Sequence, residues 1–310
     1  MKLAARGMNI MRGCGHAIGM GLYVMFWTIL LSGCSDILLL NPKGPVGISE
    51  RYAIGVAFAL MLIVVIPVIV MAVWFPHRYK ESASTDDYDP KWSHSGKIDL
   101  IIWLIPAVIV AGLGTLAWKE THRLDPFQPI ASAVSPINIE AVSLDWKWLF
   151  IYPDQHIATV NQLVIPVATP VSFRITSGSV MTSFFIPQLG SQIYAMAGMQ
   201  TRLHLLANEP GNYIGQNQQF SGRGYSDMNF NVRVASRQQF EDWVQQVKQS
   251  PHKLDLAGFR EISVPSTNFP VTSYAAVESG LFDEIVNTFR SAAKDKRRDG
   301  RPEHTALEKH

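Results

Sequence analysis

The residues with the clearest chemical spacing lie in segment 216–228, which reads Gln-Asn-Gln-Gln-Phe-Ser-Gly-Arg-Gly-Tyr-Ser-Asp-Met. A copper-binding loop of the form Cys-x3-Cys-x3-His-x2-Met would use the spacing of Asn217, Ser221, Tyr225 and Met228. Here an amide, a hydroxyl and a phenol replace the two thiolates and the imidazole, and only the thioether remains. Amide and hydroxyl oxygens are hard, neutral, weak ligands for copper, so these residue types predict a loop that binds none.

The rest of the sequence offers no replacement for the missing thiolates. The chain of 310 residues has two cysteines, Cys14 and Cys34, so no disulfide framework and no thiolate metal site is expected in its bulk. A net charge of +2 does not suggest a nucleic-acid partner. Charged residues make up 17% of the chain, with the deficit in its N-terminal part, which indicates membrane segments attached to a soluble domain.

The N-terminus has the parts of a secretory signal. A basic leader is followed by an apolar run and then by Leu-Ser-Gly-Cys34, which resembles a bacterial lipobox. Cleavage would remove residues 1–33 and leave Cys34 as an acylated first residue, and two or more acyl chains anchor a protein stably. The alternative is an uncleaved signal anchor in which Cys34 stands by chance.

Two long apolar segments, residues 53–75 and 98–118, are expected to cross a membrane within an anchor region of residues 34–125. The loop between them is richer in Lys and Arg than the segment before them, so the positive-inside rule places that loop in the cytoplasm. The lipobox independently places Cys34 outside, which gives the same topology. A buried helical pair is the alternative. Asp99 is the one ionisable residue of the second segment and would lie at its cytoplasmic end.

Residues 126–236 are expected to form an exported β-sandwich or barrel. After a proline-marked linker, short runs of alternating apolar and polar residues are separated by turn residues, which is typical of that class. The expected strands are 137–144, 146–151, 162–165, 171–176, 201–207 and 228–234. Trp146 and Trp148 would lie on the same side of one strand, as core or interface aromatics.

Residues 237–293 are expected to form a helical extension of this domain. Ser236 and Gln239 have the spacing of a capping box, and residues 281–290 show the apolar periodicity of another amphipathic helix. The charged tail 294–310 lacks that periodicity and is expected to be disordered.

This order of features resembles subunit II of the haem–copper oxidases from residue 34 to residue 289. The motif Thr182-Ser-Phe-Phe-Ile-Pro187, the turn Pro210-Gly-Asn-Tyr213 and the loop 216–228 carry the resemblance. It implies a membrane-anchored all-β protein: a two-helix transmembrane hairpin, a cupredoxin-like Greek-key β-sandwich and C-terminal helices. In the cytochrome c-oxidising members that sandwich holds a binuclear copper centre. The positions that match its ligands carry Thr182, Asn217, Gln219, Ser221, Tyr225 and Met228, of which only the methionine is retained.

The quinol-oxidising branch, the bo-type ubiquinol oxidases, gives the best match. Residues 189–205 closely resemble the sequence of that branch: Leu-Gly-Ser-Gln-Ile-Tyr-Ala-Met-Ala-Gly-Met-Gln-Thr-Arg-Leu-His-Leu. The resemblance implies a non-redox subunit of a proton-pumping quinol oxidase, with no cofactor or catalytic centre of its own. It places haem and copper in the large subunit I, adds subunits III and IV as partners, and implies a bacterial inner membrane with the C-terminal domain in the periplasm.

The resemblance also bears on Asp99. In this family an acidic residue, usually Glu, lies at that place, at the mouth of a proton channel into the large subunit. It therefore implies a contribution of Asp99 to proton uptake, although Asp is one methylene shorter. The alternative is an interfacial carboxylate attracted by the positive N-terminal end of its helix.

Two other functions remain open on sequence alone. The first is a copper electron-transfer subunit of a cytochrome c oxidase, against which the missing cysteines argue. The second is a free-standing periplasmic binding lipoprotein with a cupredoxin-like domain. Copurification with a multi-span haem protein would separate these possibilities.

Overall fold

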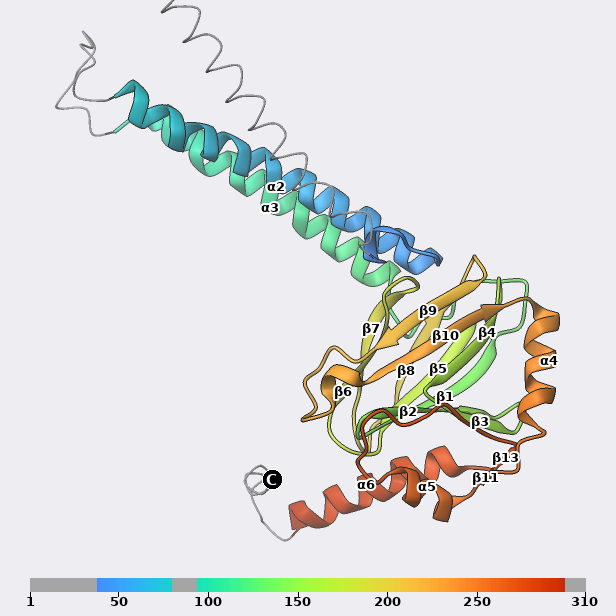
Figure 1. Cartoon of the computed structure of the whole chain (residues 1–310). Helices are drawn as coiled ribbons and strands as arrows, with labels where there is room; N and C mark the ends of the chain where they lie inside the picture. The colour runs from blue at the N-terminus through green and yellow to red at the C-terminus, as the bar shows by residue number, and fades with distance from the viewer. Residues whose placement is uncertain (1–37, 80–93, 299–310) are drawn as a thin grey trace, which may run out of the picture. The chain divides into compact units, whose positions relative to one another are not determined.

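The computed structural model describes residues 38–79 and 94–298 (Figure 1). The predicted signal peptide 1–33, Cys34 and the last part of the predicted tail, 299–310, lie outside the described residues. Residues 1–41 form a separate unit of the chain, in which the described part contains the short 3-10 helix η2 (Leu38–Leu40).

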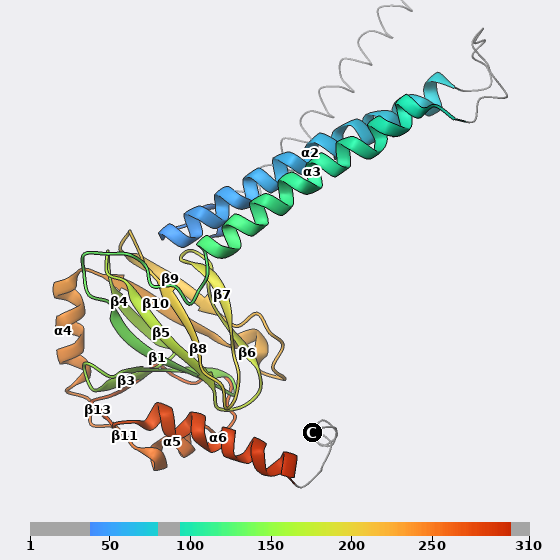
Figure 2. The same ribbon diagram turned by 180° about the vertical axis from the view of Figure 1, so that it is seen from behind.

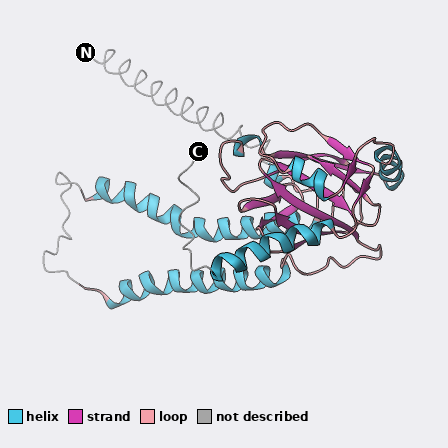
Figure 3. Cartoon of the chain, turned by 90° about the horizontal axis from the view of Figure 1, so that it is seen from below, coloured by secondary structure: helices cyan, strands magenta, loops and turns pink. Residues whose placement is uncertain are grey.

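Two long helices, α2 (Pro45–Arg78) and α3 (Gly96–Arg123), contact one another and run side by side (Figure 3). Their most apolar windows have mean hydropathies of 3.2 and 2.4, and no residue of these windows is buried. Both helices are therefore long and apolar enough to cross a membrane. They contain the predicted spans 53–75 and 98–118 and extend beyond them. Pro45 is suited to begin α2, since a helix leaves its first N–H groups unpaired.

The strands form two sheets of a sandwich, gathered in one body (Figure 3), which confirms the predicted fold class. One sheet has the order β12-β3-β2-β1-β5-β8, and the other has the order β4-β10-β9-β6-β7. Within them, β1 pairs with β5 and β4 with β10 in parallel. The strands are β1 (Ile137–Leu144), β2 (Lys147–Tyr152), β3 (Ile157–Val160), β4 (Gln162–Pro166), β5 (Val171–Ser177), β6 (Thr182–Ile186), β7 (Gly190–Ala195), β8 (Thr201–Leu205), β9 (Gly211–Gln216), β10 (Asn229–Ala235) and β12 (Thr272–Tyr274).

Five of these strands, β3, β6, β7, β9 and β12, are missing from the sequence prediction. A single residue, Asn161 with a φ of 57°, leads the chain from β3 in one sheet to β4 in the other, without the cluster of turn residues that marks a boundary in sequence. In β6 four of the five residues are buried, so it lacks the alternation that identifies a strand with one exposed face.

The six-stranded sheet is buried on both faces at its strands β2 and β3. Its inner face packs against the five-stranded sheet around Trp148, Phe150 and Phe184. Its outer face is covered by α5 (Leu256–Ile262) and α6 (Leu281–Arg298), a layering visible from both sides (Figures 1 and 2). Every residue of β2 is consequently buried, and the expected alternation is absent there.

The C-terminal extension begins as predicted. At the start of α4 (Arg237–Val247), the Ser236 hydroxyl accepts a hydrogen bond from the Gln239 N–H, and the Gln239 side chain accepts one from the Ser236 N–H. These two bonds complete the capping box. The apolar face of α4 is buried through Phe240, Trp243, Val244 and Val247. Between α4 and α6, β11 (Lys253–Leu254) pairs with β13 (Ala276–Val277). Helix α6 runs to Arg298, so the first residues of the predicted disordered tail are helical.

Candidate functional site

The loop of residues 217–228 connects two neighbouring antiparallel strands, β9 and β10. Because Gln216 pairs with Asn229, the two ends of the loop emerge side by side. The Asn217 N–H donates to the Met228 carbonyl over 3.3 Å, which continues the ladder by one rung. The short 3-10 helix η3 (Tyr225–Asp227) precedes Met228. Strand pairing therefore holds Asn217 and Met228 next to one another, independently of the residues in the loop between them.

Asn217 is the centre of a buried polar group that also contains Ser183, Ser221 and Met228, here called the amide cluster. Its Nδ2 lies 2.8 Å from the Gln219 carbonyl, 3.2 Å from Ser221 Oγ and 3.4 Å from Met228 Sδ. Its Oδ1 accepts from the N–H groups of Ser183 and Gln219, both at 2.9 Å. Asn217 is 5% exposed and Met228 1%, so these bonds are shielded from water.

The structure brings together some of the predicted positions and separates others. The side chains of Asn217, Ser221 and Met228 meet, whereas Gln219 contributes through its backbone. Thr182 donates instead to Ser143 Oγ at 2.6 Å, and the Tyr225 ring lies 5.8 Å from that of Phe220. Within the described part of the chain, the side chains of Thr182 and Tyr225 make no hydrogen bond to the amide cluster, and Tyr225 reaches it only through its carbonyl, which accepts from the Met228 N–H at 3.2 Å.

Sequence reasoning missed Ser183, which takes the place beside Asn217 that was expected for Thr182. The Ser183 hydroxyl also accepts from the Gln218 N–H at 2.7 Å. Successive side chains of a strand point to opposite faces, so neighbours in β6 serve different partners. The serine belongs to the same motif as Thr182, but the sequence does not show which of the two faces the loop, because that depends on the register of β6.

The amide cluster does not fit copper. Copper sites in proteins need donor atoms with free electron pairs, and the binuclear centre that would use this spacing needs two bridging thiolates. Here the Asn217 oxygen already accepts from two N–H groups, and its nitrogen carries protons that point to the loop carbonyl, the Ser221 hydroxyl and the Met228 sulfur. In residues 38–79 and 94–298, no group of three or more His, Cys, Asp or Glu side chains is placed to hold a metal ion.

Trp146 packs on the loop. It was predicted to lie in a strand, but it lies just before that strand begins. Leu144 pairs with Lys147, so Trp146 lies in the two-residue turn between β1 and β2. Its indole Nε1 donates to the Ser221 carbonyl at 2.8 Å, and a Cβ at Gly224 would come within 2.5 Å of the ring. Trp146 thus packs on the loop, while Trp148 is fully buried in the core.

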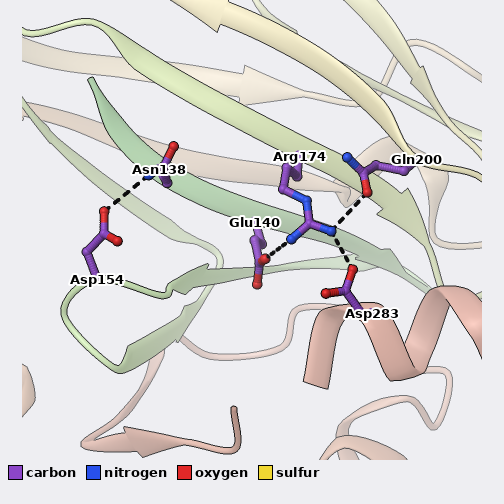
Figure 4. Close-up of polar contacts among 6 residues, drawn as sticks. All are labelled: Asn138, Glu140, Asp154, Arg174, Gln200 and Asp283. Atoms are coloured by element: carbon purple, nitrogen blue, oxygen red, sulfur yellow. Dashed lines mark hydrogen bonds and ion pairs between the residues drawn. The ribbon is translucent and has the colours of Figure 1, made fainter. Parts of the chain in front are cut away.

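A second polar group joins the sandwich to α6 and was not foreseen from sequence (Figure 4). Arg174 of β5 lies directly opposite Glu140 of β1 in the parallel register, with Nη1 and Oε1 at 2.6 Å. Its Nη2 contacts Gln200 Oε1 at 2.9 Å and also Asp283 of α6. We call these four residues the Arg174 cluster. Burial raises the pKa of Glu140 above its ordinary value, and the Arg174 guanidinium opposes that rise.

A buried lysine ties the segment 264–269 to β2. The Lys147 ammonium donates to the Val264 carbonyl at 2.9 Å, contacts the Ser266 hydroxyl and lies 4.6 Å from the centre of the Phe269 ring. The residue is 1% exposed, and burial lowers the pKa of its amine. Its role is structural, since it holds a crossing segment against the sheet.

Asp99 lies in the first turn of α3, where the prediction placed it. One carboxylate oxygen is 2.8 Å from Nδ1 of His94, and the Asp99 side chain is 48% exposed. His94 precedes the helix and is a neighbour that the sequence did not assign. The pair joins a carboxylate to an imidazole at the start of the helix.

Two family models match the chain: "Cytochrome C oxidase subunit II, periplasmic domain" over residues 154–235 and "COX Aromatic Rich Motif" over residues 248–291. A cytochrome bo(3) ubiquinol oxidase subunit 2 of Pseudomonas aeruginosa is 52% identical, over 84% of this chain and 78% of its own length. The chain belongs to the ubiquinol oxidase subunit 2 family.

Another sequence relative agrees with this membership. A ubiquinol oxidase subunit 2 of Acetobacter aceti is 49% identical over 85% of this chain and 86% of its own length. The solved periplasmic domain of subunit II of the cytochrome oxidase of Bradyrhizobium japonicum aligns over 38% of this chain and 96% of its own, with 22% identity and a TM-score of 0.36. The predicted resemblance to the quinol-oxidising branch is thus confirmed by the sequence relatives.

Proposed function

We propose that this chain is the copper-free subunit II of a proton-pumping quinol:oxygen oxidoreductase and that it conducts no electrons itself. The observation that carries the proposal is the amide of Asn217, which fills the loop with hydrogen bonds where copper donors would stand. Membership of the ubiquinol oxidase subunit 2 family supports ubiquinol as the electron donor of the complex.

The route of the electrons follows from the loop. A water-soluble cytochrome would need a metal acceptor in this domain, and the buried groups of the loop supply no redox centre. A quinol dissolved in the membrane can instead reduce haem in the large subunit I directly. The haems and the oxygen-reducing copper then lie in that partner, with subunits III and IV completing the complex.

The location of the chain is part of the proposal. Helices α2 and α3 span the bacterial inner membrane, with their connecting loop in the cytoplasm and the sandwich in the periplasm. Cys34, acylated after removal of residues 1–33, adds a lipid anchor on the periplasmic side. The work of the chain is to pack its helices against the large subunit and to cover that subunit's outer surface.

The choice of donor gives the first test. The purified complex that contains this chain is expected to oxidise ubiquinol with oxygen and to leave reduced cytochrome c untouched, because no acceptor for the latter is present. Oxygen consumption measured with each donor decides the point. Rapid oxidation of cytochrome c would contradict the proposal, and isolation of the chain without a haem-bearing partner would favour a free-standing lipoprotein.

Asp99 is the proposed contribution of this chain to proton uptake. Its support is the carboxylate at the cytoplasmic end of α3, paired with the His94 imidazole. Asp99→Asn is expected to slow turnover and proton uptake in vesicles, whereas Asp99→Glu retains both because it keeps the carboxylate. Lys97→Gln, which changes another charge of the same helical turn, is the matched control. Unchanged proton uptake in Asp99→Asn would remove the role.

A further inference from the structure

A cavity of about 410 Å³ lies beside the start of α2, the end of α3 and strand β8. Its lining includes Val46, Ser49, Arg123, Asp125, Ile130 and His204. The wall is thus partly apolar and carries one cation and one anion. Neither the loop of residues 217–228 nor the proposed oxidase reaction involves this cavity.

Hydrogen bonds hold the walls of the cavity in place. The Gly47 N–H, near the start of α2, donates to the Leu189 carbonyl at 3.1 Å. His204 Nδ1 lies 3.0 Å from the Pro126 carbonyl, and its Nε2 lies 3.3 Å from Ser172 Oγ. The imidazole therefore fixes the segment after α3 against the sheet, and the cavity is a built feature of the fold.

The depth of the cavity along the two helices matches a lipid headgroup layer. The apolar segments end at residue 53 in α2 and at residue 118 in α3. At about 1.5 Å of rise per residue, Ser49 and Arg123 lie about 6 to 8 Å beyond those ends. The headgroup layer on each side of a bilayer is about 5 to 7 Å thick. Both helices therefore place the cavity at the depth of the lipid headgroups, between the acyl chains and bulk water.

The two charged side chains of the cavity, Arg123 and Asp125, have hydrogen-bonding groups that are free to bind a ligand. Arg123 is exposed and has no ion-pair partner within residues 38–79 and 94–298. One oxygen of the half-buried Asp125 accepts from the Phe127 N–H at 3.0 Å, and no described donor bonds to the other. A guanidinium binds phosphate through paired N–H donors, and a free carboxylate oxygen accepts from a primary ammonium.

We propose that this cavity binds the headgroup of a zwitterionic glycerophospholipid with a primary amine, phosphatidylethanolamine. Its phosphate would lie on Arg123 and its ammonium on Asp125, with Val46 and Ile130 against the glycerol and the first methylenes. Phosphatidylglycerol has the same phosphate but no ammonium, so Asp125 would face neutral hydroxyl groups and remain without a cation. Phosphatidylcholine offers no N–H donor to that carboxylate, so the site discriminates between the two zwitterionic lipids.

The inference rests on the proposed membrane insertion of α2 and α3 and not on the oxidase reaction. A failure here leaves the donor preference of the complex unaffected. Conversely, loss of the oxidase proposal through cytochrome c activity would leave this lipid site standing, since the test below reads out lipid contact alone.

Photolabelling of the full-length chain in phosphatidylcholine nanodiscs tests the site. A trace of phosphatidylethanolamine with a diazirine near its glycerol is compared with matching choline and glycerol probes, and labelled peptides are mapped by mass spectrometry. Segment 124–131 is expected to be labelled about tenfold more by the ethanolamine probe than by either other probe, because a hydrogen bond to a charged group contributes about 1.5–3 kcal/mol.

Variants of Arg123 and Asp125 test the role of each charged side chain in lipid binding. Arg123→Gln is expected to lower labelling by the ethanolamine probe about tenfold, and Asp125→Asn to abolish the preference for ethanolamine over choline. Lys119→Gln, an exposed cation at the same end of α3 outside the cavity, should change neither result. Equal labelling by all three probes, stronger labelling by the glycerol probe, or full labelling of Arg123→Gln would overturn the proposal.

Discussion

The amide cluster and the Arg174 cluster join distant segments of one sandwich by different means. Around Asn217 every group is neutral. Its Nδ2 donates to the Gln219 carbonyl, the Ser221 hydroxyl and the Met228 sulfur, and its Oδ1 accepts from two N–H groups. Around Arg174 a single guanidinium contacts two carboxylates and an amide, and its side chain is 33% exposed. The first is a closed set of hydrogen bonds, and the second is an ion-pair network open to water.

The difference indicates how each segment is held. The loop has few apolar contacts of its own, since Phe220 at its middle is 74% exposed. Its conformation therefore depends on Asn217. Helix α6 has a second source of stability, because Leu281, Phe282 and Ile285 are each 1% exposed in the outer core. Loss of one residue should consequently cost more in the neutral cluster than in the charged one.

The largest expected effect is that of Asn217→Ala. The change leaves the buried N–H groups of Ser183 and Gln219 without an acceptor, and a buried unsatisfied donor costs about 1–3 kcal/mol. The free energy of unfolding should fall by about 3 kcal/mol in urea titrations of the full chain in detergent, followed by tryptophan fluorescence. Asn231→Ala, an exposed asparagine of β10, is the control and should change stability by less than about 0.5 kcal/mol. Equal effects would show that the amide is not central.

Arg174→Met is expected to cost less, about 2 kcal/mol in the same titration, because its removal leaves the buried Glu140 unpaired while water still reaches the site. The exposed pair of Arg237 and Glu241, at 3.3 Å, provides the control. Arg237→Met should change stability by less than about 0.5 kcal/mol. If Arg174→Met destabilised the domain more than Asn217→Ala, the comparison between the two clusters would be reversed.

Gly224→Ala should have a smaller and more local effect. The added methyl would lie 2.5 Å from the Trp146 ring, so the ring must move and the domain loses about 1 kcal/mol through overpacking. The emission of Trp146 should shift to longer wavelength as its ring becomes more exposed. Ser226→Ala, an exposed change in the same loop, should leave both stability and emission unaltered. An unchanged spectrum in Gly224→Ala would mean that Trp146 does not pack on the loop.

The smallest effect concerns pH. Burial raises the pKa of Glu140, with Asp283 and Asp154 adding to the rise and Arg174 opposing it. A carboxyl with a raised pKa in the folded state stabilises the fold below its ordinary pKa, and this contribution is lost as pH rises through the raised value. Stability relative to Glu140→Gln, measured by urea titration at a series of pH values, should therefore decline as the pH rises from below the ordinary carboxyl pKa through the raised one. The opposite slope would mean that Arg174 outweighs burial.

Sequence alone predicted the features that depend on local pattern. The capping box at Ser236 and the buried face of α4 follow from residues three or four apart, and the two apolar helices follow from composition. The spacing of the loop singled out Asn217 and Met228, and the structure places them together because they stand at the two ends of a hairpin loop.

What sequence could not provide are pairings set by register. Whether Thr182 or Ser183 faces Asn217 depends on which side of β6 meets β9, and a shift by one residue reverses it. The Arg174 cluster needs the parallel pairing of β1 with β5 and the docking of α6, which brings in Asp283 from 109 residues away. Trp146 was misplaced since the turn between β1 and β2 is only two residues long.

The copper content of the full-length chain tests the central claim most directly. The chain, purified in detergent and supplied with excess copper, is desalted and analysed by atomic emission together with its absorption spectrum. With Asn217, Ser221 and Met228 bonded to one another, we predict about a tenth of a copper per chain or less and no thiolate-to-copper absorption. A stoichiometric binuclear copper centre in the sandwich would contradict the account.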